Sequence, residues 1–299
     1  MRGVWTALIT PFDEYGCIDQ KAFCKILQEQ VNAGVAGVVP CGTTGESPTL
    51  TAEERKMLIT TTIRELKGSN LKIIAGTGTN NTAETIELSK WASDQGVHGV
   101  LIVTPYYNKP SQAGLESHFS SVADAVSCEV VLYNVPSRTG ISLNTRAICA
   151  LAANPKITAI KEATGNVAFS SEIIDALADN QSQMDLLSGD DATFLPLLSI
   201  GAVGIISVAS NLFPRTMVAL QKSCEVSAIK EAMQIHQRFY PLFRDLFIES
   251  NPVPIKYVMS KMGWCYSNVR PPLVGLSDEN KIKLDSCLKK CGVLKGKPL

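Results

Sequence analysis

The chain has 299 residues, of which 45% are hydrophobic and 19% are charged, as is typical of a globular protein with one large domain or two ordinary ones. Lysine plus arginine and aspartate plus glutamate number 28 each, so no net charge attracts nucleic acid or an anionic membrane surface. Nine cysteines without a C-x-x-C pair, and only three histidines, argue against a Cys/His metal site.

No targeting or membrane segment is recognisable in the sequence. Residues 1–7 hold no apolar run long enough for a signal peptide, and no later run approaches the length of a membrane span. We therefore expect a cytoplasmic protein whose cysteines stay reduced and mostly pack as small apolar side chains.

Short apolar runs alternate with helical patterns through the first three quarters of the chain. Eight runs predict strands, at residues 4–9, 35–41, 71–75, 97–103, 129–133, 157–160, 184–187 and 203–206. Helical patterns between them cover 19–34, 51–66 and 82–95 and begin again near 111 and 144. Strands that are apolar on both faces and separated by helices form parallel sheets, and eight such units fit a closed (β/α)8 TIM barrel.

A doubly wound open sheet is the alternative α/β fold. Its Gly-x-Gly-x-x-Gly turn after the first strand is missing, so we predict the barrel. From about residue 225 only helical patterns remain, over 228–248, after 254 and over 278–291. The prediction is a catalytic barrel at 1–224 and a C-terminal helical appendage at 225–299, with a frayed tail at 295–299.

Lys161 is the residue around which a site can be predicted. It ends the apolar run of the sixth strand and is followed by the polar turn 162–166. An ammonium held against apolar side chains loses hydration, which favours the neutral amine and makes it a nucleophile toward carbonyl groups. The alternative interpretation is a lysine that reaches solvent from the strand end or pairs with Glu162.

The other strand ends supply the groups that such a lysine needs, because reacting groups of a (β/α)8 barrel come from the carboxyl ends of its strands. Tyr133 ends the preceding strand and can carry protons if Thr43 and a second tyrosine complete a hydrogen-bonded chain. In the alternative interpretation, the Tyr133 ring only covers the end of the barrel and takes no part in chemistry. Arg138 has the planar guanidinium that suits a substrate carboxylate, although an ordinary surface ion pair is the alternative.

Two further strand ends bear on substrate binding. The Gly-Thr-Thr-Gly run at 42–45 offers hydroxyls and backbone N–H groups that fit a carboxylate, and it lacks the lysine of a nucleotide-binding P-loop. After Gly189, Asp190 and Asp191 are interpreted as a helix N-cap rather than as metal ligands. Together these groups predict a class I aldolase in which Lys161 attacks a 2-oxo acid, with no cofactor and no metal.

Four motifs resemble those of the 4-hydroxy-tetrahydrodipicolinate synthases, within the N-acetylneuraminate lyase superfamily. They are GTTGES at 42–47, TPYYNKP at 104–110, YNVPSRTG at 133–140 and IKEATGN at 160–166. Shorter matches at 188–191, 204–208 and 251–256 extend the likeness over nearly the whole chain. The resemblance implies condensation of pyruvate with L-aspartate 4-semialdehyde through a lysine Schiff base, in diaminopimelate and lysine biosynthesis.

The resemblance also implies a role for each matching residue. Lys161 would form the pyruvate Schiff base, and Tyr133 would donate and accept protons. Thr43 and Tyr107 would complete the relay, with Tyr107 reaching the site of a neighbouring subunit in a homotetramer built as a dimer of dimers. The implied substrate-binding groups are Thr44 and the Ile206 backbone for pyruvate, Arg138 for the second substrate, and Gly189.

A regulatory site is implied at Asn80, Glu84 and Tyr106, which fit the place where lysine-inhibited members of the family bind L-lysine at a dimer interface. Ala52 and Arg55 replace histidines of many inhibited members, so we expect inhibition to be weak or absent. An inhibition curve measures this, and strong inhibition at sub-millimolar L-lysine would contradict it.

Two other functions compete with the synthase. N-acetylneuraminate lyase or a 2-keto-3-deoxy sugar-acid aldolase would share the lysine and the tyrosine but would need polar groups for a longer polyol. The YNVPSR and GTTGE runs favour the synthase. A catalytically silent barrel with a structural or regulatory role would not need the intact set of polar residues at the strand ends.

Overall fold

A computed structural model describes residues 1–293, in which eight strands follow one another around a closed barrel in chain order. The strands are β1 Gly3–Ala7, β2 Gly37–Val39, β3 Lys72–Gly76, β4 Gly99–Val103, β5 Glu129–Asn134, β6 Ile157–Glu162, β7 Asp185–Ser188 and β8 Gly204–Ser207. The predicted (β/α)8 barrel is confirmed, and the closed strand order excludes the open sheet. The tail predicted to be frayed, 295–299, lies outside the described residues.

Helices connect the strands and continue after the last one. They are α1 Gln20–Ala33, α2 Ala52–Glu65, α3 Thr82–Asp94, α4 Gln112–Ala125, α5 Pro136–Thr139, α6 Thr145–Ala152, α7 Val167–Asp179, α8 Phe194–Ile200, α9 Pro214–Glu225, α10 Ile229–Asp245, α11 Val253–Lys261 and α12 Asp278–Lys290. Short 3-10 turns are η1 Thr43–Gly45, η2 Ser47–Thr49 and η3 Ala209–Asn211. The helical appendage predicted after residue 225 is confirmed within the described range.

The helix starts follow from side-chain caps that the sequence shows. Thr51 and Glu54 form a reciprocal capping box at the start of α2, in which each side chain accepts a hydrogen bond from the backbone N–H of the other residue. Asn81, Ser111 and Asn144 likewise accept backbone N–H groups in the first turns of α3, α4 and α6. The predicted starts of these four helices are therefore confirmed to within one residue.

The chain divides into two compact units. The first unit comprises Met1–Gly3 with Lys72–Ile206, and the second comprises Val4–Leu71 with the residues from Ser207 onward. The domain boundary predicted between residues 224 and 225 stays a prediction. None of the helices in residues 1–293 has the length and apolar character needed to cross a bilayer.

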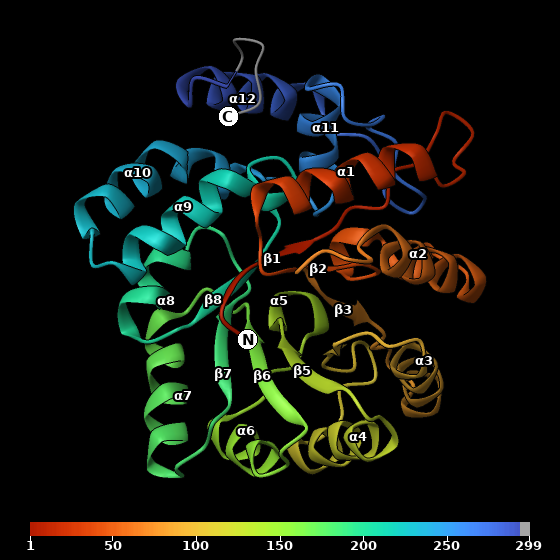
Figure 1. Ribbon diagram of the computed structural model, residues 1–299, viewed down its shortest axis with the longest axis vertical. Helices are drawn as coiled ribbons and strands as arrows, with labels where there is room; N and C mark the ends of the chain where they lie inside the picture. The colour runs from red at the N-terminus through yellow and green to blue at the C-terminus, as the bar shows by residue number, and fades with distance from the viewer. Residues whose placement is uncertain (294–299) are drawn as a thin grey trace. The chain divides into compact units, whose positions relative to one another are not determined.

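In the first unit, neighbouring parallel strands from β3 to β8 form a continuous ladder. Figure 1 shows β5, β6 and β7 side by side, with α4, α6 and α7 outside them. Leu132, Ile160 and Leu187 on three adjacent strands are fully buried. Burial on both faces explains why these strands read as continuous apolar runs in the sequence.

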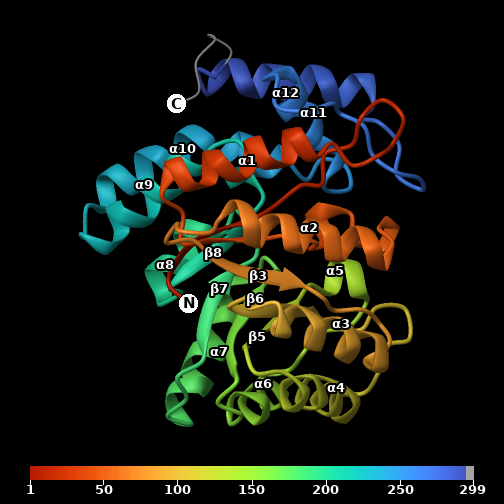
Figure 2. The same cartoon turned by 45° about the vertical axis from the view of Figure 1, so that its right-hand side comes forward.

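In the second unit, β1 pairs with β2, and the C-terminal helices pack on one another and on α1. Helix α9 packs against α10, and α12 packs against both α10 and α11 (Figure 2). Phe239 stacks on Phe243 with ring centroids 6.1 Å apart, and it also contacts Phe213 of the segment before α9. The contact of Phe239 with Phe213 therefore joins α10 to the segment that begins α9.

His118 on α4 is a buried imidazole with one hydrogen-bond partner. Its Nδ1 lies 2.9 Å from the hydroxyl of Thr82, and its Nε2 has no partner within residues 1–293. Only 4% of the residue is exposed, and burial lowers the pKa of His118 to about 4 from its ordinary value of 6.5.

We predict that His118 makes the protein less stable in mild acid. Between pH 6.5 and about 4 the unfolded chain binds a proton that the folded chain excludes, so the free energy of unfolding falls as the pH falls through that window. The loss should reach on the order of 3 kcal/mol. His118→Phe should remove this pH dependence of the free energy of unfolding, which urea unfolding of wild type and variant at several pH values measures. Thr82→Val keeps the imidazole and should therefore keep the pH dependence. Identical pH profiles of stability for wild type and His118→Phe would contradict the prediction.

Candidate active site

Lys161 and Tyr133 lie at the ends of two adjacent strands of the first unit. They are register partners in the β5–β6 ladder, and each is the second-to-last residue of its strand. The Nζ atom of Lys161 is 4.1 Å from the centroid of the Tyr133 ring, where a cation interacts favourably with the π face. Exposed fractions of 5% for Lys161 and 6% for Tyr133 exclude the interpretation of a lysine that reaches solvent.

Strand β5 extends one residue further than predicted, through Asn134, and β6 extends two residues further, through Glu162. These two residues are the next register pair, and the Nδ2 of Asn134 donates a hydrogen bond of 2.8 Å to Glu162. Glu162 also accepts a hydrogen bond from the backbone N–H of Thr164 at 2.5 Å. Burial raises the pKa of Glu162, while these hydrogen bonds oppose the rise. Since successive residues of a strand face opposite sides, this bond ties the strand ends together behind Lys161 and Tyr133.

Gly189 follows β7 and leaves room for the lysine side chain. Its backbone N–H donates a 2.7 Å hydrogen bond to the carbonyl of Glu162. A Cβ atom at this position would lie 2.6 Å from the Cβ of Ala163 and 3.1 Å from the Cγ of Lys161. The structure thus gives Gly189 a steric reason to be glycine, and its substrate-binding role stays a prediction.

Asp190 does not cap a helix. Helix α8 begins only at Phe194, and its N-cap residue Thr193 makes no side-chain cap. Asp190 instead accepts a 2.9 Å hydrogen bond from the backbone N–H of Ala192, so the N-cap interpretation is wrong, and the carboxylate closes a turn before the helix. Burial raises its pKa. Within the described part of the chain, no group of three or more His, Cys, Asp or Glu side chains is arranged to hold a metal ion.

Arg138 and Tyr107 lie on the loops that follow β5 and β4. Arg138 belongs to the single-turn helix α5, and its side chain is exposed. Tyr107 is 91% exposed and has a φ of 73°, in the left-handed region that residues other than glycine rarely occupy. An aromatic side chain with this exposure contributes little to the packing of its own chain.

Two of the three residues of the implied L-lysine-binding site, Asn80 and Tyr106, are in contact. The Nδ2 of Asn80 donates to the carbonyl of Tyr106 at 3.2 Å, which joins the loops after β3 and β4. Glu84, in the first turn of α3, accepts a 3.4 Å hydrogen bond from the hydroxyl of Thr79. The structure therefore brings Asn80 and Tyr106 into contact, and L-lysine binding stays a prediction.

Thr43 and Thr44 belong to the second unit, where they form the 3-10 turn η1. Thr44 is buried, and its hydroxyl accepts a 2.9 Å hydrogen bond from the Nδ2 of Asn251. Gly45 packs closely on the chain: an added Cβ would lie 3.2 Å from the carbonyl oxygen of Leu8. The hydroxyl of Thr10 donates to the carbonyl of Gly45 at 2.7 Å, so the turn is fixed on this side as well.

A network of charges holds the residue that follows this turn. Glu46 is buried and forms an ion pair with Lys256, which has no exposed surface. Burial lowers the pKa of Lys256, and the carboxylate of Glu46 opposes that shift. The backbone N–H of Arg270 donates to Glu46 at 2.9 Å.

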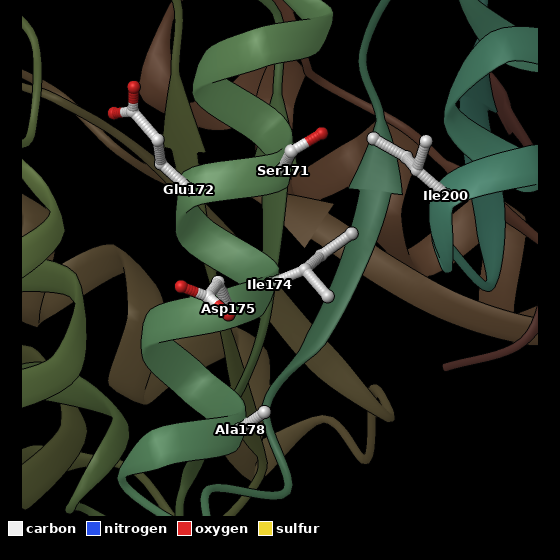
Figure 3. A pocket seen from close by; sticks show the side chains of 6 residues that line it. All are labelled: Ser171, Glu172, Ile174, Asp175, Ala178 and Ile200. Carbon is white, nitrogen blue, oxygen red and sulfur yellow. The ribbon is translucent and has the colours of Figure 1, made fainter.

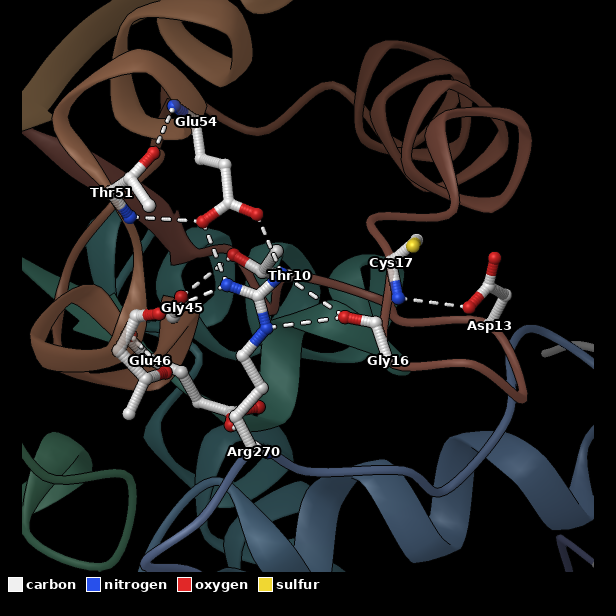
Figure 4. Close-up of polar contacts among 10 residues, drawn as sticks. Thr10, Asp13, Gly16, Cys17, Gly45, Glu46, Thr51, Glu54 and Arg270 are labelled. Atoms are coloured by element: carbon white, nitrogen blue, oxygen red, sulfur yellow. Dashed lines mark hydrogen bonds and ion pairs between the residues drawn. The ribbon is translucent and has the colours of Figure 1, made fainter.

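Arg270 also binds Glu54 through both terminal nitrogens of its guanidinium, at 2.7 and 2.6 Å (Figure 4). The same guanidinium reaches the carbonyls of Gly16 and Thr49, and its bonds to Glu54 hold the pKa of that carboxyl below its usual range. The sequence analysis did not identify Lys256, Arg270 or Asn251. Asn251 and Lys256 lie within the family match at 251–256, which assigned them no role, and Arg270 lies outside it.

A groove on the outer face of α7 and α8 is a separate feature of the first unit (Figure 3). It is lined by Ser171, Glu172, Ile174, Asp175, Ala178 and Ile200. The side chains of Glu172 and Asp175 point away from Ile200. None of the predicted site residues lines this groove, so we do not place the reaction there.

The fold and the lysine–tyrosine pair define a class, the lyases built on a (β/α)8 barrel. Residues 1–291 match the dihydrodipicolinate synthetase family, and the chain belongs to this family. The membership confirms the family that the four motifs predict.

The relatives agree with this assignment. The 4-hydroxy-tetrahydrodipicolinate synthase of Leptospira biflexa serovar Patoc is 48% identical over 277 residues, which cover 93% of this chain and 92% of that protein. The structure of the 4-hydroxy-tetrahydrodipicolinate synthase of Methylacidiphilum fumariolicum SolV superposes with a TM-score of 0.94 at 46% identity and covers 98% of this chain and 96% of that one. A structure of the Cyanidioschyzon merolae enzyme with lysine bound gives a TM-score of 0.93 at 36% identity, over 97% and 98% of the two chains. The chain is accordingly an enzyme of pyruvate-dependent condensation in lysine and diaminopimelate biosynthesis.

We predict that Gly189→Ala impairs the reaction by displacing Lys161. The new methyl group meets Ala163 at 2.6 Å and Lys161 at 3.1 Å, so one of them must move. The expected loss in kcat/KM is about tenfold or more, since small displacements of a reacting group cost that much. The double variant Gly189→Ala with Ala163→Gly removes the closest contact and should recover part of the activity.

Gly275→Ala is the matched control, because nothing lies within 4 Å of a Cβ at that position. Unchanged kinetics of Gly189→Ala would show that the site tolerates the methyl group.

Proposed function

We propose that the chain condenses pyruvate with L-aspartate 4-semialdehyde to 4-hydroxy-tetrahydrodipicolinate through a Schiff base on Lys161. The observation that carries this proposal is the burial of the lysine amine over the ring of Tyr133, 4.1 Å from its centroid. In the neutral form the amine adds to the pyruvate carbonyl and gives a carbinolamine. A proton delivered to the carbinolamine hydroxyl then lets it leave as water, which gives a protonated imine. Removal of a methyl proton then gives an enamine, whose carbon attacks the aldehyde of the second substrate.

Each of these steps moves a proton, and we assign that task to Tyr133. A phenol accepts and releases protons readily only when its hydroxyl belongs to a hydrogen-bonded relay. Thr43 and Tyr107 are the proposed members of the relay, with Tyr107 supplied by a neighbouring subunit of a homotetramer built as a dimer of dimers. The 91% exposure of Tyr107 supports this, because the ring is not packed within its own subunit. Sedimentation of the purified protein as a monomer would contradict the shared relay.

The substrates are proposed to bind through their carboxylates. Thr44 and the backbone of Ile206 would hold pyruvate, and the exposed guanidinium of Arg138 would hold the carboxylate of the semialdehyde. Gly189 would border the bound substrate. We place the reaction in the cytoplasm, where cysteines stay reduced as they are in the described structure.

Borohydride reduction tests the Schiff base directly. Wild-type protein treated with pyruvate and borohydride should gain one pyruvate-derived adduct on Lys161, read by peptide mass spectrometry, and should lose activity. Lys161→Ala should gain none. Arg138→Ala is the control: it should still trap pyruvate, because its proposed partner is the second substrate, while its turnover with the semialdehyde falls by about tenfold or more.

A parallel assay of pyruvate with N-acetylmannosamine separates the synthase from an N-acetylneuraminate lyase. An adduct on another residue would refute the role of Lys161, and turnover of the sugar in place of the semialdehyde would refute the substrate.

A further inference from the structure

The hydroxyl of Thr44 is held from one side by an amide. The Nδ2 of Asn251 lies 2.9 Å from the Thr44 Oγ1, and the two residues are 5% and 3% exposed. An amide nitrogen only donates, so the hydroxyl oxygen is the acceptor in this bond. The proton of Thr44 must therefore point away from Asn251.

Asn251 is itself fixed by its place in the second unit. It lies two residues before helix α11, and the same helix carries Lys256, the buried partner of Glu46. Glu46 follows Thr44 by two residues, so α11 and the residues directly before it hold the turn at two points. Glu46 and Cys41 both have φ values near 57° although neither is a glycine, and such a backbone persists only where its surroundings hold it.

We propose that Asn251 is a positioning residue that orients the Thr44 hydroxyl as a donor to the carboxylate of the bound keto acid. The proposal rests on the function proposed above, in which Thr44 binds pyruvate. A hydroxyl that already accepts a hydrogen bond is polarised and becomes a better donor. Without the amide, the hydroxyl can turn and donate elsewhere. Loss of this orientation should weaken pyruvate binding, and it should therefore raise the KM for pyruvate more than it lowers kcat.

Asn251→Asp provides the sharpest test because it keeps the shape of the side chain and removes the donor. A carboxylate accepts the proton of Thr44 and reverses the bond, so the hydroxyl no longer serves the substrate. The KM for pyruvate should rise by about tenfold or more, with kcat at saturating pyruvate changed by less than about threefold. Tyr257→Phe is the control on helix α11, which directly follows Asn251: it removes a 3.0 Å hydrogen bond to Asp285 and should leave the KM unchanged.

A double-mutant cycle with Thr44→Val separates positioning from a general structural effect. If Asn251 acts through the hydroxyl, Asn251→Asp should change the pyruvate dependence of borohydride trapping by less than about twofold in the Thr44→Val background. Equal effects in both backgrounds, or an unchanged KM in the single variant, would overturn the proposal. Should Asn251→Asp not fold, Asn251→Ala is read in the same cycle.

The two proposals fail in different ways. Wild-type protein that forms no adduct with pyruvate would refute the Schiff-base function itself. Wild-type trapping together with additive effects in the cycle would refute only the role of Asn251.

Discussion

The removal of one amino group from water is the constraint on which the rest of the catalytic proposal depends. Lys161 is buried at the end of a barrel strand, with its Nζ over the ring of Tyr133 on the neighbouring strand. The parallel ladder places the two residues in register, and the bond between Asn134 and Glu162 ties the next register pair. Glycine at 189 leaves space for the lysine side chain. Four local features thus combine to place one amine beside one phenol.

Much of this arrangement could be predicted because it follows from local patterns. The strands can be recognised because they are apolar on both faces. Four helix starts can be recognised from capping side chains, which bond only to residues a few positions away: Thr51, Asn81, Ser111 and Asn144. Lys161 and Tyr133 could be found because strand ends are the reactive positions of a barrel.

The errors arise where polar side chains bond to one another or to nearby backbone. Hydropathy ended the fifth strand one residue early and the sixth two residues early, because Asn134 and Glu162 read as loop residues until their hydrogen bond across the strands is known. Asp190 resembled a helix cap, yet it lies three residues before the cap position, Thr193, and closes a turn there. Asn251, Lys256 and Arg270 were missed because their partners Thr44, Glu46 and Glu54 lie more than 200 residues away in the chain. No periodicity or spacing signals a contact of that separation.

The buried pair of Glu46 and Lys256 has a consequence for the order in which the protein is made. The two residues are 210 positions apart, and Arg270, which also bonds Glu46, comes later still. A ribosome that has completed all eight barrel strands has not yet produced Lys256 and Arg270, the partners that hold Glu46 beside the turn η1. The nascent chain therefore holds no partner for the Glu46 carboxylate until its C-terminal helices are synthesised, so the turn cannot reach its final set of contacts before then.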